Sequence, residues 1–245
     1  PGNAVLFKQP SGLSEDAENI RNLPDNYYRN LMQDKDPEYV KVYIKGEYGY
    51  VQDGRPVFPE YSDSIHCQEF EPLSFVPVRF GWDFGLTPAC VLTQLTPSGT
   101  WLVFDEIIGT SIGIESFGDH VKFHLQNYWP KLMYGQSFGD PAGGQRSQTD
   151  EKTCYQILNA KGFAIEPGFQ DLTSRLESVR KPLKTLLAGK PGFLLHPRCR
   201  MLLKGFQGKY RFRRMRVAEE RYTDEPEKND YSHPADALQY VASMT

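Results

Sequence analysis

The stretch VRFGWDFGLTP, Val78 to Pro88, carries a charged residue in a setting that is typical of a buried β-strand. Because side chains alternate across a strand, Asp83 points away from Trp82 and shares a face with Arg79 and Gly81. A pairing with Arg79 or with a backbone amide would account for one such carboxylate. Other acids along the chain decide whether Asp83 has a further role.

The bulk composition sets few limits. The 245 residues are 39% hydrophobic and 24% charged, which is typical of a globular protein with a substantial core. The formal charge of −3 predicts no overall attraction to nucleic acid or membrane, so a local basic patch or a metal ion must hold any polyanion. No apolar run approaches the roughly 18 residues that span a bilayer. The four cysteines lie far apart without a C-x-x-C pair, which indicates free thiols in a reducing compartment.

The pattern of predicted secondary structure divides the chain into residues 1–72 and 73–245. The first part has two short helix-like stretches, 16–22 and 25–33, broken at Pro24 and Pro37, and we interpret it as an irregular helical linker or neck. The first residue, Pro1, is not methionine, which indicates a piece of a longer polypeptide.

The second part has strands and helices in a defined order. Strands are predicted around VPVRFGWDFG, ACVLTQL and TWLVFDEII, the last two joined by the turn TPSG, and a helix around GIESFGDHVKFHLQNYW. A fourth strand, LMYGQSFGD, precedes further α/β units and a closing helix, SHPADALQYVASM, with Ser232 expected as its N-cap. This order predicts a ribonuclease H-like α/β fold, a mixed sheet with helices on both faces. A doubly wound nucleotide fold fits less well, because no G-x-G-x-x-G follows the first strand.

Two further acids fall where this topology would bring them to Asp83. Asp140 ends the fourth strand, which is expected to lie beside the first, and Asp236 lies in the first turns of the closing helix. An aspartate at a helix start also has a simpler explanation, a favourable interaction with the helix dipole. Together, however, the three carboxylates would repel one another unless a cation lay between them.

Oxygen ligands of this kind are those that Mg²⁺ and Mn²⁺ prefer. Two such ions, about 3.5–4 Å apart, can activate water and stabilise a leaving oxygen in phosphodiester hydrolysis. We therefore expect Asp83, Asp140 and Asp236 to be both the catalytic and the metal-binding residues of a two-metal site, with Asp83 bridging the two ions.

These motifs carry a resemblance to a known family. GWDFG, GDPAG and SHPADALQY, in this order, resemble the nuclease domain of the large terminase subunit of tailed bacteriophages. NLPDNYYRNL, VYIKGEYGY and GRPVFPEYS resemble the segment that joins the ATPase domain of that motor to its nuclease. The resemblance implies an endonuclease that cuts concatemeric viral DNA in the host-cell cytoplasm, with double-stranded DNA, the small terminase subunit and the portal as partners. The chain has no G-x-x-x-x-G-K-[ST], so it cannot be the ATP-driven motor by itself.

Several residues are secondary candidates near the site. His233 could orient a metal-binding carboxylate or contact a phosphate, or it could be an ordinary histidine at a helix start. Asp230 could replace Asp236 in its role. Asp105 and Glu106 end the third strand, which we place one strand further from Asp83, so we expect a surface or supporting position for them. His120 and His124 have the i, i+4 spacing of a zinc pair but no accompanying third ligand, which favours a solvated helix face.

The most basic segment is RCRMLLKGFQGKYRFRRMR. Contacts of such a strip with the DNA backbone are independent of sequence and sensitive to salt. A solvated β-hairpin is the alternative. Two aromatic residues, Tyr210 and Phe212, interleave with the basic residues, and the expected DNA-binding residues are Lys204, Lys209, Arg211, Arg213, Arg214 and Arg216.

Three other functions stay open at this point. Actin-like ATPases and sugar kinases share the core fold and use a D-x-G turn after their first strand, but they need a second, duplicated domain for which this chain is too short. Resolvase or transposase cores share the chemistry but do not predict the neck motifs. In a non-catalytic DNA-clamp or portal-docking module, the acids would be structural.

Overall fold

The computed structural model describes residues 10–14, 16–17, 20–32, 40, 44–45, 54–145, 152–215 and 221–245. The chain forms two compact units, Pro1–Asp53 and Gly54–Thr245. Residues 54–72, which the sequence places in the neck, thus belong to the second unit. Most of the neck motif at 42–50 and the basic residue Arg216 lie outside the described residues.

The first unit contains short helical elements. A 3₁₀ helix, η1 (Ile20–Asn22), precedes helix α1 (Tyr27–Met32), and Pro24 lies between them. Both are shorter than the predicted stretches 16–22 and 25–33. Within this unit the ring of Tyr28 leaves no room for a side chain at Gly12, because a β-carbon there would lie 2.8 Å from the ring.

A six-stranded mixed sheet forms the centre of the second unit, in the order β6-β5-β2-β3-β4-β9. Its strands are β2 (Val78–Asp83), β3 (Ala89–Leu95), β4 (Trp101–Ile108), β5 (Tyr134–Gly139), β6 (Ile165–Pro167) and β9 (Phe193–Leu195). β2, β3 and β4 are the three strands predicted around the turn TPSG and form an antiparallel meander, whereas β5 pairs with β2 in parallel. The predicted neighbourhood of the first and fourth strands is therefore confirmed.

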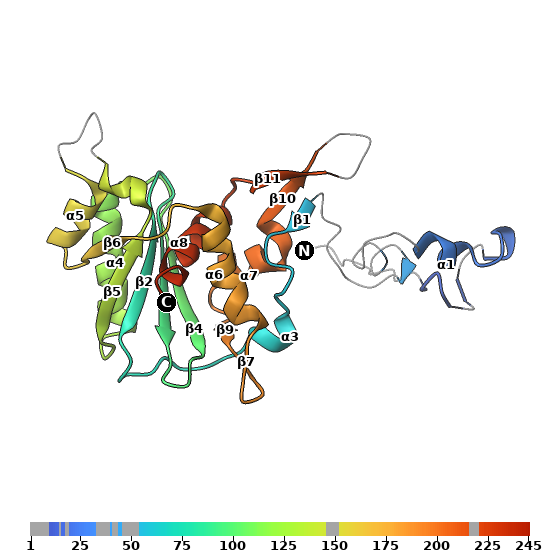
Figure 1. Cartoon of the computed structure of the whole chain (residues 1–245), viewed down its shortest axis with the longest axis horizontal. Coiled ribbons are helices and arrows are strands. Elements are labelled where there is room, and N and C mark those ends of the chain that lie inside the picture. The colour runs from blue at the N-terminus through green and yellow to red at the C-terminus, as the bar shows by residue number, and fades with distance from the viewer. Residues whose placement is uncertain are drawn as a thin grey trace, which may run out of the picture. The chain divides into compact units, whose positions relative to one another are not determined.

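Helices cover both faces of this sheet, with α4 and α5 over one face and α6 and α8 over the other (Figure 1). The helices are α3 (Asp63–His66), α4 (Ile114–Tyr128), α5 (Cys154–Ala160), α6 (Leu172–Lys184), α7 (Arg200–Lys204) and α8 (Ser232–Ala242), with the short turns η3 (Pro141–Gly144) and η4 (Gly205–Lys209). A three-stranded sheet and a hairpin complete the unit, formed by β1 (Gly54–Pro56), β10 (Arg211–Arg214) and β11 (Tyr222–Pro226), and by β7 (Leu186–Leu187) and β8 (Lys190–Pro191).

The alternation of side chains in β2 divides the core between these two layers. Val78, Phe80 and Trp82 pack with the buried face of α4. The opposite face of the sheet packs against α6, α7 and α8 through a second apolar cluster. Asp83 therefore points toward the α8 side, as the strand pattern predicts.

Local details of three helices depend on their packing, and one of them differs from the sequence prediction. Tyr128, at i+7 from Val121 in α4, is 67% exposed, because Phe117, Val121 and Leu125 already fill the apolar face of that helix. The helix containing Pro182 ends at Lys184, and the residues after it turn into the β7–β8 hairpin. Ser232 is the first helical residue of α8 rather than its N-cap, since its hydroxyl donates to the carbonyl of Asn229.

No helix in the described ranges combines the length and the apolar character that crossing a bilayer requires.

Candidate metal-binding active site

Asp83 and Asp140 lie at the same edge of the sheet, where two neighbouring parallel strands end. Trp82 of β2 is in register with Gly139 of β5, and the amide of Asp140 donates to the carbonyl oxygen of Trp82 at 3.2 Å. Asp83 directly follows Trp82, and Asp140 directly follows Gly139. The parallel pairing thus brings together two acids that are far apart in the sequence.

Helix α8 brings Asp236 to this edge because it packs on β2 at a glycine. A β-carbon on Gly81 would lie 2.1 Å from the carbonyl oxygen of Ala237, so a larger residue there would displace α8. In the first turn of α8, His233 places Nδ1 3.0 Å from Oδ2 of Asp83. The start of α8 is thereby bonded to the end of β2.

The carboxylates are buried and interact electrostatically. Asp83 and Asp236 are only 7% and 3% exposed. Burial raises the pKa of Asp83, the hydrogen bond from His233 lowers it, and the charge of Asp236 raises it again. The pKa of Tyr240 is raised mainly by burial and further by the charges of Asp140, Asp236 and Asp83. The three acids therefore share one electrostatic environment around α8.

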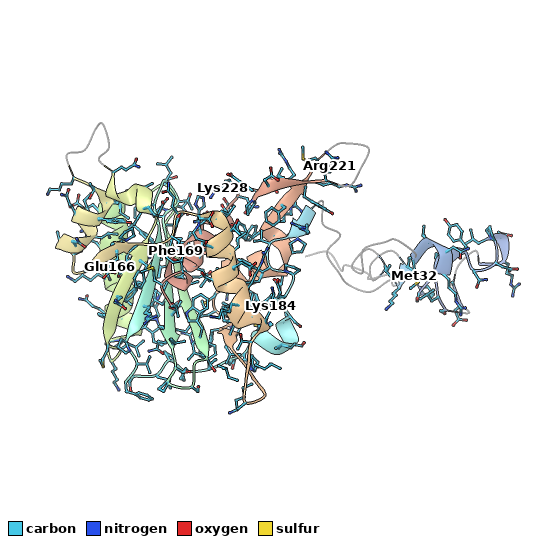
Figure 2. The ribbon with its side chains drawn as sticks, viewed as in Figure 1. Met32, Glu166, Phe169, Lys184, Arg221 and Lys228 are labelled. Atoms are coloured by element: carbon cyan, nitrogen blue, oxygen red, sulfur yellow. The ribbon has the colours of Figure 1, made fainter. Side chains whose placement is uncertain are left out.

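Asp236 is surrounded by donors. Lys228, on the segment between β11 and α8 (Figure 2), places Nζ 2.5 Å from Oδ2. Tyr210 and Gln239 donate to Oδ1, each at 3.3 Å. The guanidinium of Arg175 approaches the same oxygen to 4.0 Å. This carboxylate is held by groups from three separate segments besides its own helix.

Asp140 has a different, more local environment. It is half-buried, and its side chain accepts a hydrogen bond from the amide of Ala142, which caps the turn η3. Tyr155 of α5 donates to its carbonyl oxygen at 2.9 Å. These contacts fix the GDPAGG turn at the end of β5. Residues 146–151, which follow this turn, lie outside the described residues.

The donor set fits a hard divalent cation in its chemistry, because three carboxylates supply oxygen ligands and negative charge in a buried place. In the described ranges, no three His, Cys, Asp or Glu side chains gather closely enough to hold an ion. Lys228 and His233 are instead bonded to two of the acids. Binding of a metal by all three acids therefore requires these side chains to rearrange.

No protein-family model and no curated protein matches the chain. Solved structures do match. The large terminase from a thermophilic bacteriophage aligns with a TM-score of 0.58 and 14% identity over 91% of this chain and 52% of that one. The nuclease domain of the P22 large terminase aligns with a TM-score of 0.55 and 14% identity over 79% of this chain and 94% of the domain. The chain has the fold of a large-terminase nuclease domain.

This terminase-nuclease fold is ribonuclease H-like, as the order of strands predicts. The nuclease from a second thermophilic phage, G20c, solved with bound cobalt, aligns with a TM-score of 0.50 and 13% identity over 77% of this chain and 97% of that one. The chain spans about half the length, 52%, of the first of these relatives, the large terminase.

Within the terminase-nuclease fold, the secondary candidates take separate positions. Asp230 is exposed in the turn before α8. Asp105 accepts hydrogen bonds from His124 and Trp129, each at 2.7 Å, on the α4 side of the sheet. Glu106 accepts from two amides at the start of α7, those of Met201 at 2.6 Å and Leu202 at 2.9 Å.

The basic strip spreads over α7, η4 and β10. Lys204, Lys209, Arg213 and Arg214 are exposed. Arg211 forms an ion pair of 3.3 Å with Glu227. Exposed acids, Asp224 and Glu225, follow on the neighbouring strand β11, so the surface of this sheet carries both signs of charge.

The two aromatic residues of the strip do not take part in this surface. Tyr210 and Phe212 are 2% and 5% exposed and pack in the apolar core. The expected interleaving of aromatic and basic groups at a DNA surface is therefore absent at these two positions, because alternation along β10 turns Phe212 inward.

The sequence did not point to two further residues of the site. Lys228 belongs to a mixed-charge stretch, EPEKND, with no local signal of its role. Arg175 lies among Leu172, Leu176, Val179 and Leu183 at the spacing of a buried helix face, and a charge at such a position is the signal that could have revealed it.

Proposed function

We propose that the chain is the nuclease part of a large terminase and that it cuts concatemeric viral DNA during genome packaging. Asp83, Asp140 and Asp236 would hold two divalent ions, Mg²⁺ or Mn²⁺, with Asp83 shared between them. The observation that carries the proposal is the arrival of three buried or half-buried acids at one sheet edge within a terminase-nuclease fold. The cobalt in the G20c nuclease structure supports divalent metal use.

When bound, a pair of divalent ions lowers the pKa of an attacking water and stabilises the leaving oxygen of the phosphodiester. The side chains of the chain set up this site. In the metal-free state, His233 restrains Asp83 through the bond to Oδ2. The cap on η3 holds Asp140 at the end of β5. The close packing at Gly81 keeps Asp236 beside Asp83.

The substrate and partners follow from the same proposal. Double-stranded DNA would lie against Lys204, Lys209, Arg211, Arg213 and Arg214, with Arg216 further along the strip. The small terminase subunit and the portal would be the protein partners, in the cytoplasm of the infected host cell. The large-terminase identity of the aligned structures supports this assignment.

Plasmid cleavage by the purified chain tests the function. We expect linearisation with Mg²⁺ or Mn²⁺, none with EDTA, and none by Asp83→Asn. Asp105→Asn is the matched control, since Asp105 is another buried strand aspartate whose described bonds come from His124, Trp129 and the amide of Glu106. Cleavage by Asp83→Asn at the wild-type rate would exclude the site. A folded wild type that binds DNA but does not cut it with either metal ion would favour the non-catalytic clamp.

A further inference from the structure

Arg175 of α6 is a buried cation with unused hydrogen-bonding capacity. The residue is 9% exposed, and its Nε and Nη1 have no hydrogen-bond partner among the described residues. Its guanidinium carbon lies 4.7 Å from the centroid of the Tyr240 ring. Its Nη1 lies 4.0 Å from Oδ1 of Asp236. Buried donors without partners are uncommon in proteins because each carries a desolvation penalty.

Asp236 lies between two cations of different character. The side chain of Lys228, which is bonded to Oδ2, is 73% exposed, whereas that of Arg175, close to Oδ1, is 11% exposed. An exposed lysine on a connecting segment can leave its partner at little cost, because water replaces the contact. A buried arginine cannot, and it stays next to the carboxylate.

We propose that Arg175 is a positioning residue for Asp236. It donates to Oδ1 in the state in which Lys228 has left the carboxylate and Oδ2 is free to bind a metal ion. A small approach of Nη1 would turn the present 4.0 Å contact into a charge-assisted hydrogen bond, whose usual length is about 2.7–2.9 Å. This inference rests on the proposed metal site, and it gives the unpartnered donors of Arg175 a use.

Two different roles for Arg175 agree less well with its surroundings. Direct binding of a DNA phosphate would need accessible donors, but Nε and Nη1 are sealed from solvent. A purely packing role, through the stem and the stack on Tyr240, would need no charge. An apolar residue of similar length would fill that role, and this difference makes the proposal testable.

The first test measures Mn²⁺ binding to the full chain by titration calorimetry without DNA. We expect Arg175→Met to weaken binding at least about tenfold, as is typical when a group that orients a metal ligand is removed. Arg175→Lys should recover much of the loss, and Lys228→Ala should bind at least as tightly as wild type. Arg180→Met on the same helix is the control, since Arg180 pairs with Glu177 and Glu60.

The outcomes separate this inference from the proposed function. Unchanged Mn²⁺ affinity in Arg175→Met overturns the positioning role and leaves the metal site standing. If wild type binds no Mn²⁺, or if Asp83→Asn binds it equally well, the proposed function fails instead.

A second test needs no metal. Urea unfolding in EDTA is measured for Arg175→Met, for Asp236→Asn and for the double variant. The same three variants are then made and measured in the Lys228→Ala background. We expect non-additive shifts of the unfolding midpoint, larger in the Lys228→Ala background, because Arg175 is then the remaining lysine or arginine that the described residues place within 4.0 Å of Asp236. Additive shifts in both backgrounds overturn the proposal even if the metal measurement fails.

Discussion

Gly81 of β2 lies directly beneath Ala237 of α8, so close that a β-carbon on Gly81 would come within 2.1 Å of the Ala237 carbonyl oxygen and 2.8 Å of Cγ1 of Val241. Asp83 follows two positions after Gly81 in β2, and Asp236 directly precedes Ala237 in α8. The absence of a side chain at Gly81 therefore lets α8 pack closely on the part of β2 that carries Asp83.

Gly81→Ala should lower stability and impair the site together. Forcing a methyl group into this contact costs about 1–3 kcal/mol, and the backbone of α8 must move away with His233 and Asp236. Urea unfolding and metal-dependent plasmid cleavage measure the two effects. Gly113→Ala is the control, because the space around Gly113 is open and its φ is −72°. Full stability and full cleavage in Gly81→Ala would contradict the close approach.

His233 should titrate above its ordinary pKa of 6.5, because its hydrogen bond to Asp83 raises the pKa. The stability that this bond contributes is present below pH 6.5 and is lost as the pH rises through the folded-state pKa. NMR titration of the metal-free protein measures it directly, and Asp83→Asn should return the pKa toward 6.5. His196 provides an internal control, since burial and then the charge of Arg198 lower its pKa. A His233 pKa that does not change in Asp83→Asn would mean that the bond is not formed in solution.

Glu106 should make the protein less stable as the pH rises. Burial raises its pKa from 4.5 to about 7, against the opposing effect of its two amide hydrogen bonds. The folded state then holds this proton more tightly than the unfolded state, so stability falls between pH 4.5 and about 7 and is level above that range. The shift corresponds to a loss of about 3 kcal/mol at most.

The matched variant for Glu106 is Glu106→Gln, which keeps the shape without the titration. Its unfolding free energy, measured in urea between pH 4 and 8, should lack this part of the slope. Parallel pH curves for wild type and Glu106→Gln would show that the folded-state pKa of Glu106 is not raised.

Arg213→Ala and Arg214→Ala should weaken DNA binding equally for different DNA sequences. Both side chains are exposed on β10, and contacts with phosphates do not depend on sequence. Each substitution should reduce the slope of log K against log salt by about 1. Fluorescence anisotropy at several salt concentrations measures this slope. The control is Lys131→Ala, which changes an exposed lysine in the turn after α4. Equal slopes for all variants would favour the alternative interpretation of the strip, a solvated hairpin.

Local patterns were sufficient to predict much of the central sheet. The alternation in Val78–Asp83 and the turn between β3 and β4 predicted three strands close to their observed bounds, because hydrogen bonding and burial in a meander depend on neighbouring segments. Asp83 and Asp140 were predicted together for a related reason, since both end a strand and parallel strands end at a common edge.

Only the tertiary structure showed which groups surround these acids. Lys228, Arg175 and Tyr210 approach Asp236 from a connecting segment, a helix and a core position. Tyr210 was expected on a DNA surface and is buried, because the direction of its side chain depends on the packing of η4 rather than on the composition of the strip. The sequence by itself determined four strands of the central sheet and their order, and it proposed the three acids as candidates, since these follow from periodicity and strand ends. Packing between distant segments decided the partners of each acid, because a buried charge is stabilised by whatever the fold brings within a few ångströms of it.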